Sequence, residues 1–369
     1  MRGKILFNGN MGNIGALMER VRPWVPSGSP KVLLVTAAWG PGEFGEGPVK
    51  AALNQIGVPS RFEGGFDQNI GNLCAWHVTR AFLERRPDVA AVAAEIERSE
   101  DAIRDFYVEM TAFHAERIRR AVRLARERVP AFSLGQLSPK ASVRPEAAHS
   151  GAELISAAIG RELAMSLAAL VDNDQRMLGA LAAADEQLHA RTGLRLDPHW
   201  RRERAALEER ILAADLVFFF GGDPSSLLAP FHFFDLRPAL LESLRRGATF
   251  VAISAGSLFL CERMIIYDDY NPDPARREFR LHDRGLGLVG GLQIMPHCMD
   301  RIHTDDGDNL AYLARRFSTH VCAGLNEESF LLVDMARSAA QSVGEHDGVY
   351  VFGPQGMKLC YHRGERIPI

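Results

Sequence analysis

One serine in a run of small residues is the first candidate for chemistry. Residues 249–258 read Thr-Phe-Val-Ala-Ile-Ser-Ala-Gly-Ser-Leu, an apolar strand-forming run followed by a small-residue turn and a helix-compatible run. This order predicts a nucleophile elbow, in which Ser254 stands exposed at a sharp strand-to-helix turn. Small neighbours relieve crowding there, and the N-terminus of the next helix favours negative charge at that point. A strand-to-helix turn without chemistry is the alternative.

Two glycines follow the apolar run Phe218–Phe220, and they are the candidates for anion binding. Glycine lets a backbone approach a ligand closely, and open α/β sheets bind ligands at the carboxyl ends of their strands. An exposed N–H of Gly222, paired with the N–H of Ala255, would form an oxyanion hole. A tight turn that requires positive φ also explains the glycine pair.

A serine hydroxyl is a weak nucleophile without a base, so a histidine must lie close to it. Of the 12 histidines, His297 is the best placed, because it ends the strand-forming run 291–296; His303 and His282 are the alternatives. An acid must orient the imidazole. Asp269 lies between the serine and the histidine in sequence, and Glu327 follows a later strand-forming run.

The elements that must position these residues fall into two regimes. Residues 1–65 alternate strand and helix patterns, with a fully apolar strand at 31–36, which indicates a parallel sheet covered on both faces. Residues 70–212 are rich in Ala, Arg and Glu, and the apolar spacing from Ile103 to Ala125 predicts three or four solvated helices. The strand pattern resumes at 216–220, continues at 249–253, 292–295, 320–323 and 330–333, and closes with a hairpin of 350–352 and 357–361.

We therefore predict a three-layer α/β sandwich around a mostly parallel sheet, with a large helical insertion and a C-terminal β hairpin. Residues 1–66 and 208–369 would form the catalytic α/β domain, and residues 67–207 the helical insertion.

Composition narrows the class of protein. The 369 residues are 47% hydrophobic with a net charge of −3, which supports a large core and disfavours nucleic acid as a partner. Five cysteines without a C-x-x-C pair, and no apparent signal peptide or membrane span, predict a cytoplasmic protein. The acidic run 303–308 does not fit a metal loop, so we expect neither a metal nor another cofactor.

Taken together, four segments resemble the serine peptidase family of cyanophycinase and aspartyl dipeptidase, whose fold is like that of class I glutamine amidotransferases. The segments are Gly221-Gly222-Asp223, Ala252-Ile253-Ser254-Ala255-Gly256-Ser257, Pro296-His297 and Gly324-Leu325-Asn326-Glu327-Glu328-Ser329. The resemblance is loose over residues 1–65, good over 208–362, and absent from the helical tract. The chain departs from the family pattern at Ala252, which replaces glycine, and at Ser257, which replaces alanine.

The resemblance implies a serine hydrolase of a peptide or isopeptide bond, with Ser254 as nucleophile and His297 as general base. Glu327 is the preferred acid and Asp269 the alternative. Asp223 and Arg301 would bind substrate, since an arginine four residues after the histidine can hold a substrate carboxylate. The expected partners are a small peptide or aspartyl substrate and a second copy in a homodimer. An amidase, esterase or acyl transferase with the same triad, or a non-catalytic binding protein, stays open.

Overall fold

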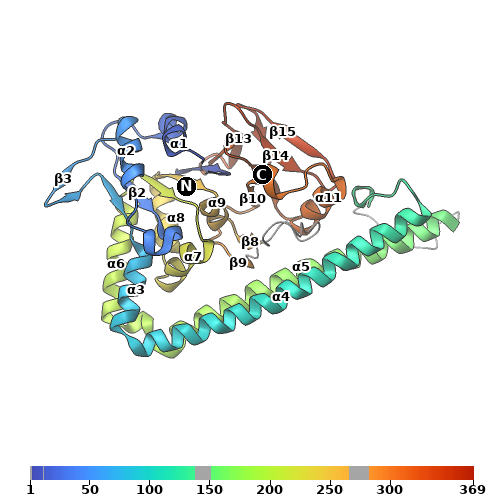
Figure 1. Cartoon of the computed structure of the whole chain (residues 1–369), viewed down its shortest axis with the longest axis horizontal. Helices are drawn as coiled ribbons and strands as arrows, with labels where there is room; N and C mark the ends of the chain where they lie inside the picture. The colour runs from blue at the N-terminus through green and yellow to red at the C-terminus, as the bar shows by residue number, and fades with distance from the viewer. Residues whose placement is uncertain (1, 11, 138–150, 266–281) are drawn as a thin grey trace.

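A central sheet of eight strands forms the framework of the protein (Figure 1). The computed structural model describes residues 2–10, 12–137, 151–265 and 282–369. Five strands run parallel, in the order β1 (Lys4–Asn8), β7 (Thr249–Ile253), β6 (Leu216–Phe219), β2 (Val32–Val35) and β5 (Ile70–Asn72). Beyond β1 the sheet continues antiparallel through β12 (Phe330–Asp334), β13 (Ala339–Ser342) and β16 (Arg366–Ile367). The predicted mostly parallel sheet is confirmed, with an antiparallel end.

Helices cover both faces of this sheet, which explains why its inner strands β2 and β6 are apolar at every position. One face packs on α1 (Ile14–Val21) and α2 (Gly47–Gln55), through residues such as Leu6, Phe218 and Leu53. The other face packs on α3 (Ala75–Arg85), α6 (Pro198–Ala213), α7 (Pro224–Phe233), α8 (Arg237–Arg246) and α9 (Ala255–Leu260). Phe7, Phe219 and Phe259 are fully buried on that side.

A second, smaller sheet lies beside the first and carries the strand that leads to His297. Its order is β10 (Leu292–Pro296), β11 (Val321–Leu325), β14 (Val349–Phe352) and β15 (Lys358–Tyr361). The predicted strands and closing hairpin are present, but β10 and β11 belong to this separate sheet and do not extend the central one. Met295, Cys322 and Phe352 instead pack on α11 (Gly307–Arg316), which gives the small sheet a core of its own.

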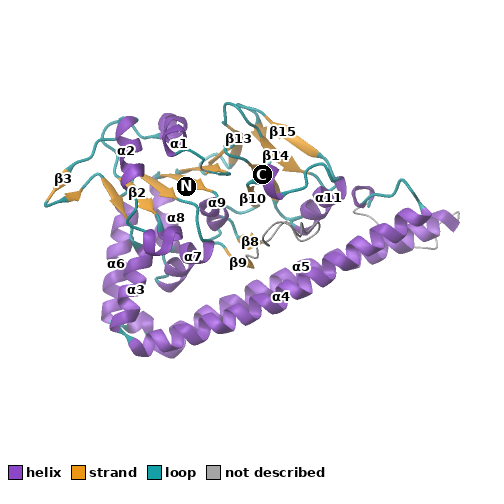
Figure 2. Cartoon of the chain, viewed as in Figure 1, coloured by secondary structure: helices purple, strands orange, loops and turns teal. Residues whose placement is uncertain are grey.

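Two long antiparallel helices, α4 (Pro87–Arg128) and α5 (Gly151–Thr192), extend past the second sheet (Figure 2). Each has 42 residues. The apolar spacing predicted the first of them because Ala115, Ile118 and Val122 face the buried side. A fully buried ion pair between Asp174 of α5 and Arg316 of α11 ties the pair to the second sheet. The proposed domain boundaries at residues 66/67 and 207/208 stay a prediction.

The remaining elements are short. They are the helical turns η1 (Arg22–Trp24), η2 (Ala37–Gly42), η3 (Leu134–Gln136), η5 (Leu194–Leu196) and α10 (Cys298–Arg301), and the two-stranded pairs β3 (Phe62–Glu63) with β4 (Phe66–Asp67) and β8 (Arg263–Ile265) with β9 (His282–Arg284). Within the described ranges, none of the helices combines the length and apolar character needed to cross a bilayer.

Candidate active site

Ser254 occupies a strained turn between β7 and α9. Its backbone has φ 52° and ψ −113°, a conformation that non-glycine residues rarely adopt and that is often kept at functional sites. Two glycines make room for it. A Cβ at Gly221 would come within 2.8 Å of the Ser254 Cβ, and one at Gly256 would collide with the carbonyl oxygen of Phe219. Ser254 therefore lies in a crowded strand-to-helix turn that glycines on two sides accommodate, and its role as an elbow nucleophile stays a prediction.

Asn8, at the end of β1, holds the elbow from the opposite side. Its carbonyl oxygen accepts two hydrogen bonds, one from the Ser254 N–H at 3.0 Å and one from the Ser257 hydroxyl at 2.9 Å. Its side-chain Nδ2 donates to the carbonyl oxygens of Glu327, at 2.7 Å, and of Ser329, at 3.0 Å. Asn8 thus joins the elbow to the loop after β11, and the hydroxyl of Ser257 explains why serine replaces alanine there.

His297 meets Ser254 from the second sheet. It follows β10 directly, has left-handed backbone angles of φ 54° and ψ 39°, and places Nε2 2.8 Å from the Ser254 Oγ. Among the described residues, it is the histidine within hydrogen-bond distance of that hydroxyl. Asn326 supports the turn, because its Oδ1 accepts the Met299 N–H at 2.9 Å while its Nδ2 donates to Asp347 at 2.8 Å.

The surroundings of His297 favour the neutral imidazole. Burial and, to a smaller extent, the nearby positive charge of Arg301 lower its pKa from 6.5 to about 4, against an opposing effect of Asp300. At neutral pH the ring is therefore uncharged, and one of its nitrogens can accept a proton from the serine.

Ala255 directly follows the serine, and Gly222 follows Gly221, whose Cβ position lies against the Ser254 side chain. Gly222 has φ 144°, and a Cβ there would come within 2.5 Å of the Ala38 oxygen, so only glycine fits. Ala255 is the first residue of α9, and an N–H in the first turn of a helix has no partner within that helix. Asp223 caps α7, since its Oδ2 accepts the Ser226 N–H at 2.8 Å.

Glu327 and Asp269 are the two candidate acids of the triad. The carboxylate of Glu327 lies so close to Gly12 that a Cβ added at residue 12 would collide with it. Within the described residues, it makes no hydrogen bond with His297. Asp269 lies outside the described residues. Arg301 is one turn after the histidine, and its N–H donates to the His297 carbonyl oxygen at 2.9 Å.

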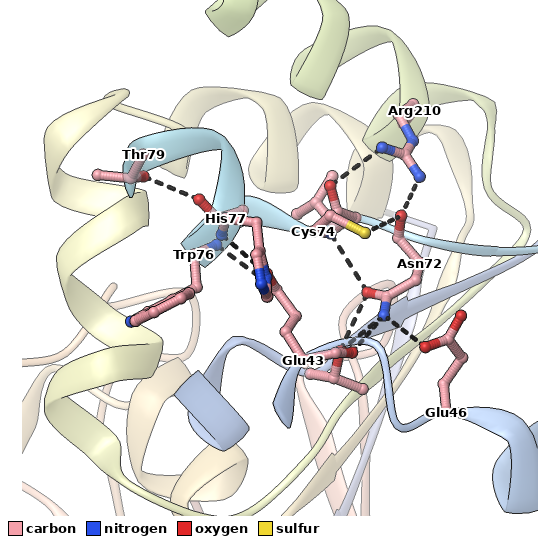
Figure 3. A network of polar contacts seen from close by, with 11 residues as sticks. Glu43, Glu46, Asn72, Cys74, Trp76, His77, Thr79 and Arg210 are labelled. Atoms are coloured by element: carbon pink, nitrogen blue, oxygen red, sulfur yellow. Dashed lines mark hydrogen bonds and ion pairs between the residues drawn. The ribbon is translucent and has the colours of Figure 1, made fainter. Parts of the chain in front are cut away.

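A buried polar network shapes the same sheet edge on the side of β2 and β5 (Figure 3). The fully buried carboxylate of Glu43 accepts the N–H groups of Trp76, at 3.2 Å, and His77, at 2.9 Å, and lies 2.8 Å from the His77 Nδ1. Asn72 Nδ2 donates to the Glu43 carbonyl oxygen at 2.8 Å. These bonds hold the loop after β2, from which the Trp39 Nε1 donates to the Gly221 oxygen at 3.0 Å.

Cys74 belongs to this network and is not a competing nucleophile. Burial, assisted by the negative charge of Glu43, raises its pKa to about 11, so the thiol stays protonated at neutral pH. The acidic run 303–308 also has structural roles: Asp306 caps α11, and Asp308 pairs with Arg126 of α4 at 2.5 Å.

Sequence reasoning missed Asn8, Asn326, Glu43 and Trp39. Each is a single polar or aromatic residue next to a strand end or in a loop, and none belongs to a periodic pattern. The glycines beside them were the available signal, because a backbone that requires glycine marks a close approach by another segment.

An elbow serine paired with a histidine, at the edge of a mostly parallel sheet, is the arrangement of a serine peptidase. The family model for peptidase family S51 matches residues 168–354, just over half of the chain. The chain therefore belongs to peptidase family S51. The matched range contains Ser254 and His297 and begins within α5.

The other comparisons add less. None of the curated proteins matches the chain. Among solved structures, the chain is similar to one described as the crystal structure of a peptidase from an acI-B1 Actinobacterium. That similarity has 12% sequence identity and a TM-score of 0.47, and it covers 100% of this chain and 98% of the other.

Proposed function

We propose that this S51 peptidase cleaves a peptide or isopeptide bond of a small, aspartyl-containing substrate through an acyl-enzyme. The observation that carries the proposal is the 2.8 Å contact between the Ser254 Oγ and the His297 Nε2 at a strained elbow. A hydroxyl within hydrogen-bond distance of a neutral imidazole is the arrangement that nucleophilic catalysis by serine requires.

The proposed reaction has two halves. The Ser254 oxygen bonds to the substrate carbonyl carbon while His297 takes the hydroxyl proton, and the N–H groups of Gly222 and Ala255 stabilise the oxyanion. His297 then gives its proton to the leaving amine as the C–N bond breaks. Water attacks the ester with the same base, which releases the acid product and restores the serine.

For the acid of the triad we propose Glu327, with Asp269 as the alternative. The Glu327 loop is joined to the elbow by Asn8, which bonds both segments. Arg301 and Asp223 are proposed to bind substrate, Arg301 through a bidentate contact with a carboxylate. The Oδ2 of Asp223 caps α7, so we propose that its other carboxylate oxygen, Oδ1, contacts the substrate.

Three further proposals concern the fold class and its catalytic domain, the cellular compartment and the oligomeric state. Helices on both faces of the sheet support the likeness to class I glutamine amidotransferases and a catalytic domain made of residues 1–66 and 208–369. The five cysteines are unpaired, which supports a reducing compartment such as the cytoplasm. We also propose that the protein is a homodimer.

Amine release from a peptide panel tests the function. The panel contains α-aspartyl, β-aspartyl and matched alanyl dipeptides, and the expected result is turnover of an aspartyl member with slower turnover of its alanyl match. A fluorophosphonate probe, followed by peptide mass mapping, is expected to label Ser254. Labelling without turnover of any peptide would replace the aspartyl substrate by another acyl compound, and labelling elsewhere would overturn the role of Ser254.

The pH dependence of catalysis is a separate prediction. Because His297 must be neutral to act as a base, and its pKa is lowered to about 4, kcat/KM is expected to hold from pH 7 to pH 5 and to fall near pH 4. Replacing Arg301 by glutamine removes a charge that lowers this pKa, so the fall should move to higher pH. Rate profiles of both proteins, with circular dichroism at each pH to verify folding, check this; a wild-type midpoint near 6.5 would contradict it.

A further inference from the structure

The charges of α4 are divided along its length. Its N-terminal half is acidic, and its C-terminal half is basic. The acids before Met110 are Asp88, Glu95, Glu97, Glu100, Asp101, Asp105 and Glu109, and the arginines after it are Arg117, Arg119, Arg120, Arg123, Arg126 and Arg128. The helix macrodipole favours such an order only within the terminal turns, so it does not account for charges near the middle of a 42-residue helix.

Part of this division lies on one exposed face. At about 100° per residue, Asp105, Glu109, Phe113, Arg120 and Arg123 project from the side opposite the buried Thr111, Ala115, Ile118 and Val122. Phe113 is 60% exposed, and Phe106, which lies about two helical turns before it on the same side, is 57% exposed. Along the helix, the outward face of α4 therefore carries Asp105, Phe106, Glu109 and Phe113, then Glu116, which pairs with Arg119 at 3.0 Å, and then Arg120 and Arg123.

Four charged residues of this face, Asp105, Glu109, Arg120 and Arg123, have no ion-pair partner within the described part of the chain. Their neighbours differ, because Glu95 pairs with Arg191 at 2.7 Å and Arg117 pairs with Glu162 at 2.9 Å. Like charges three or four residues apart destabilise an isolated helix. Asp105 with Glu109, and Arg120 with Arg123, are such pairs, and an opposite charge from outside the chain would relieve both.

We propose that α4 packs antiparallel against α4 of a second copy of this chain, about a two-fold axis next to Phe113. Two pairs of opposite charges define the position of this axis along the helix. Residues 105 and 123 are centred on residue 114, and residues 109 and 120 are centred half a residue further along. Turning the helix end for end about this point places Asp105 opposite Arg123, and Glu109 opposite Arg120, with both Phe113 rings at the axis. A single two-fold contact thus satisfies all four charges on each helix.

The contact is long enough to be specific. The helices would overlap from Arg104 to Leu124, about 30 Å at 1.5 Å per residue, with Arg104 of one copy opposite Leu124 of the other. Leu124 is 48% exposed in the single chain, so the overlap covers a third large apolar side chain. The family match starts at residue 168, so this surface lies outside it. The proposal specifies the homodimer proposed above and does not depend on the role of Ser254.

Charge reversal with sedimentation equilibrium tests the surface on the full chain. Wild type is expected to dimerise, more weakly as NaCl is raised. The double substitutions D105R/E109R and R120E/R123E are each expected to weaken self-association by at least tenfold, because like charges then face each other. An equal mixture of the two is expected to form a heterodimer, since one chain then carries only positive and the other only negative charge at the four positions.

The control is Glu97→Arg, a charge reversal of an exposed residue on another side of α4, which should leave self-association unchanged. All the substituted residues are exposed, and circular dichroism verifies that the helices persist. A wild type that stays monomeric at 100 µM, charge-reversal variants that dimerise like wild type, or a mixture that does not associate would each overturn the proposal. Peptide turnover is measured separately, so failure of the catalytic proposal would not change these readouts.

Discussion

Replacing Ser254 by alanine is expected to lower kcat/KM by about 10⁴- to 10⁶-fold. The substitution removes the atom that would form the acyl-enzyme, and the remaining acceleration would come from the oxyanion donors and from binding. His297→Ala should cost a similar factor, and the double substitution should cost little more, because a nucleophile and its base act as a unit. Amine release by the preferred substrate, followed for each variant at saturating and limiting concentration, measures this.

Ser257→Ala is the matched control for that experiment. Ser257 lies three residues later in the same elbow, and its hydroxyl bonds the carbonyl oxygens of Asn8, at 2.9 Å, and Ala252, at 2.8 Å. Its loss should reduce stability by about 1 kcal/mol and leave kcat/KM within about tenfold of wild type. Comparable losses in both alanine variants would indicate that the elbow had been distorted, and retained activity in Ser254→Ala would remove it as the nucleophile.

Asp174→Ala is expected to reduce the free energy of unfolding by about 3–5 kcal/mol, the cost of leaving one member of a buried ion pair without its partner. Both Asp174 oxygens accept from Arg316 at 2.8 Å, and both side chains are fully buried. The carboxylate is on α5 and the guanidinium on α11, so the substitution would loosen the attachment of the helical pair to the second sheet. Urea unfolding, followed by fluorescence and circular dichroism together, measures the loss.

The control for this prediction lies two residues earlier on the same helix. Asp172 is half exposed and pairs with Arg176 within α5, so Asp172→Ala should change stability by less than about 0.5 kcal/mol. A double substitution of Asp174 and Arg316 by leucine and methionine should recover much of the stability, because no buried charge remains. A loss below 1 kcal/mol for Asp174→Ala would mean that water reaches Arg316.

The elements of the site that sequence alone predicts are those with a strong local pattern. An apolar strand before small residues is enough to predict the turn at Ser254, and apolar residues at helical spacing are enough to predict α4 from Ile103 to Ala125. The strand before His297 was predictable for the same reason. Its place in a second sheet was not, because strand pairing depends on contacts between β10, β11 and β14, which are far apart in sequence.

The supporting residues escaped prediction because their roles are set by tertiary contacts. Glu43 follows a glycine-rich loop and resembles a solvated side chain in sequence, yet it is fully buried because two N–H groups at the start of α3 satisfy its carboxylate. Asn8 is one amide at the end of an ordinary strand. Asp223 carries a helix cap, a local role that its position before Pro224 indicates in sequence.

The place of β1 in the central sheet has a consequence for how the protein matures. β1 lies between β7 and β12, whose residues follow more than 240 positions later. Such long-range pairing makes for slow folding, and β1 cannot be enclosed until both of these later strands have been synthesised. Ser254 and His297 also come from different sheets, so the nascent polypeptide cannot assemble the pair early. The reactive centre therefore forms only after segments of both sheets have been synthesised and paired.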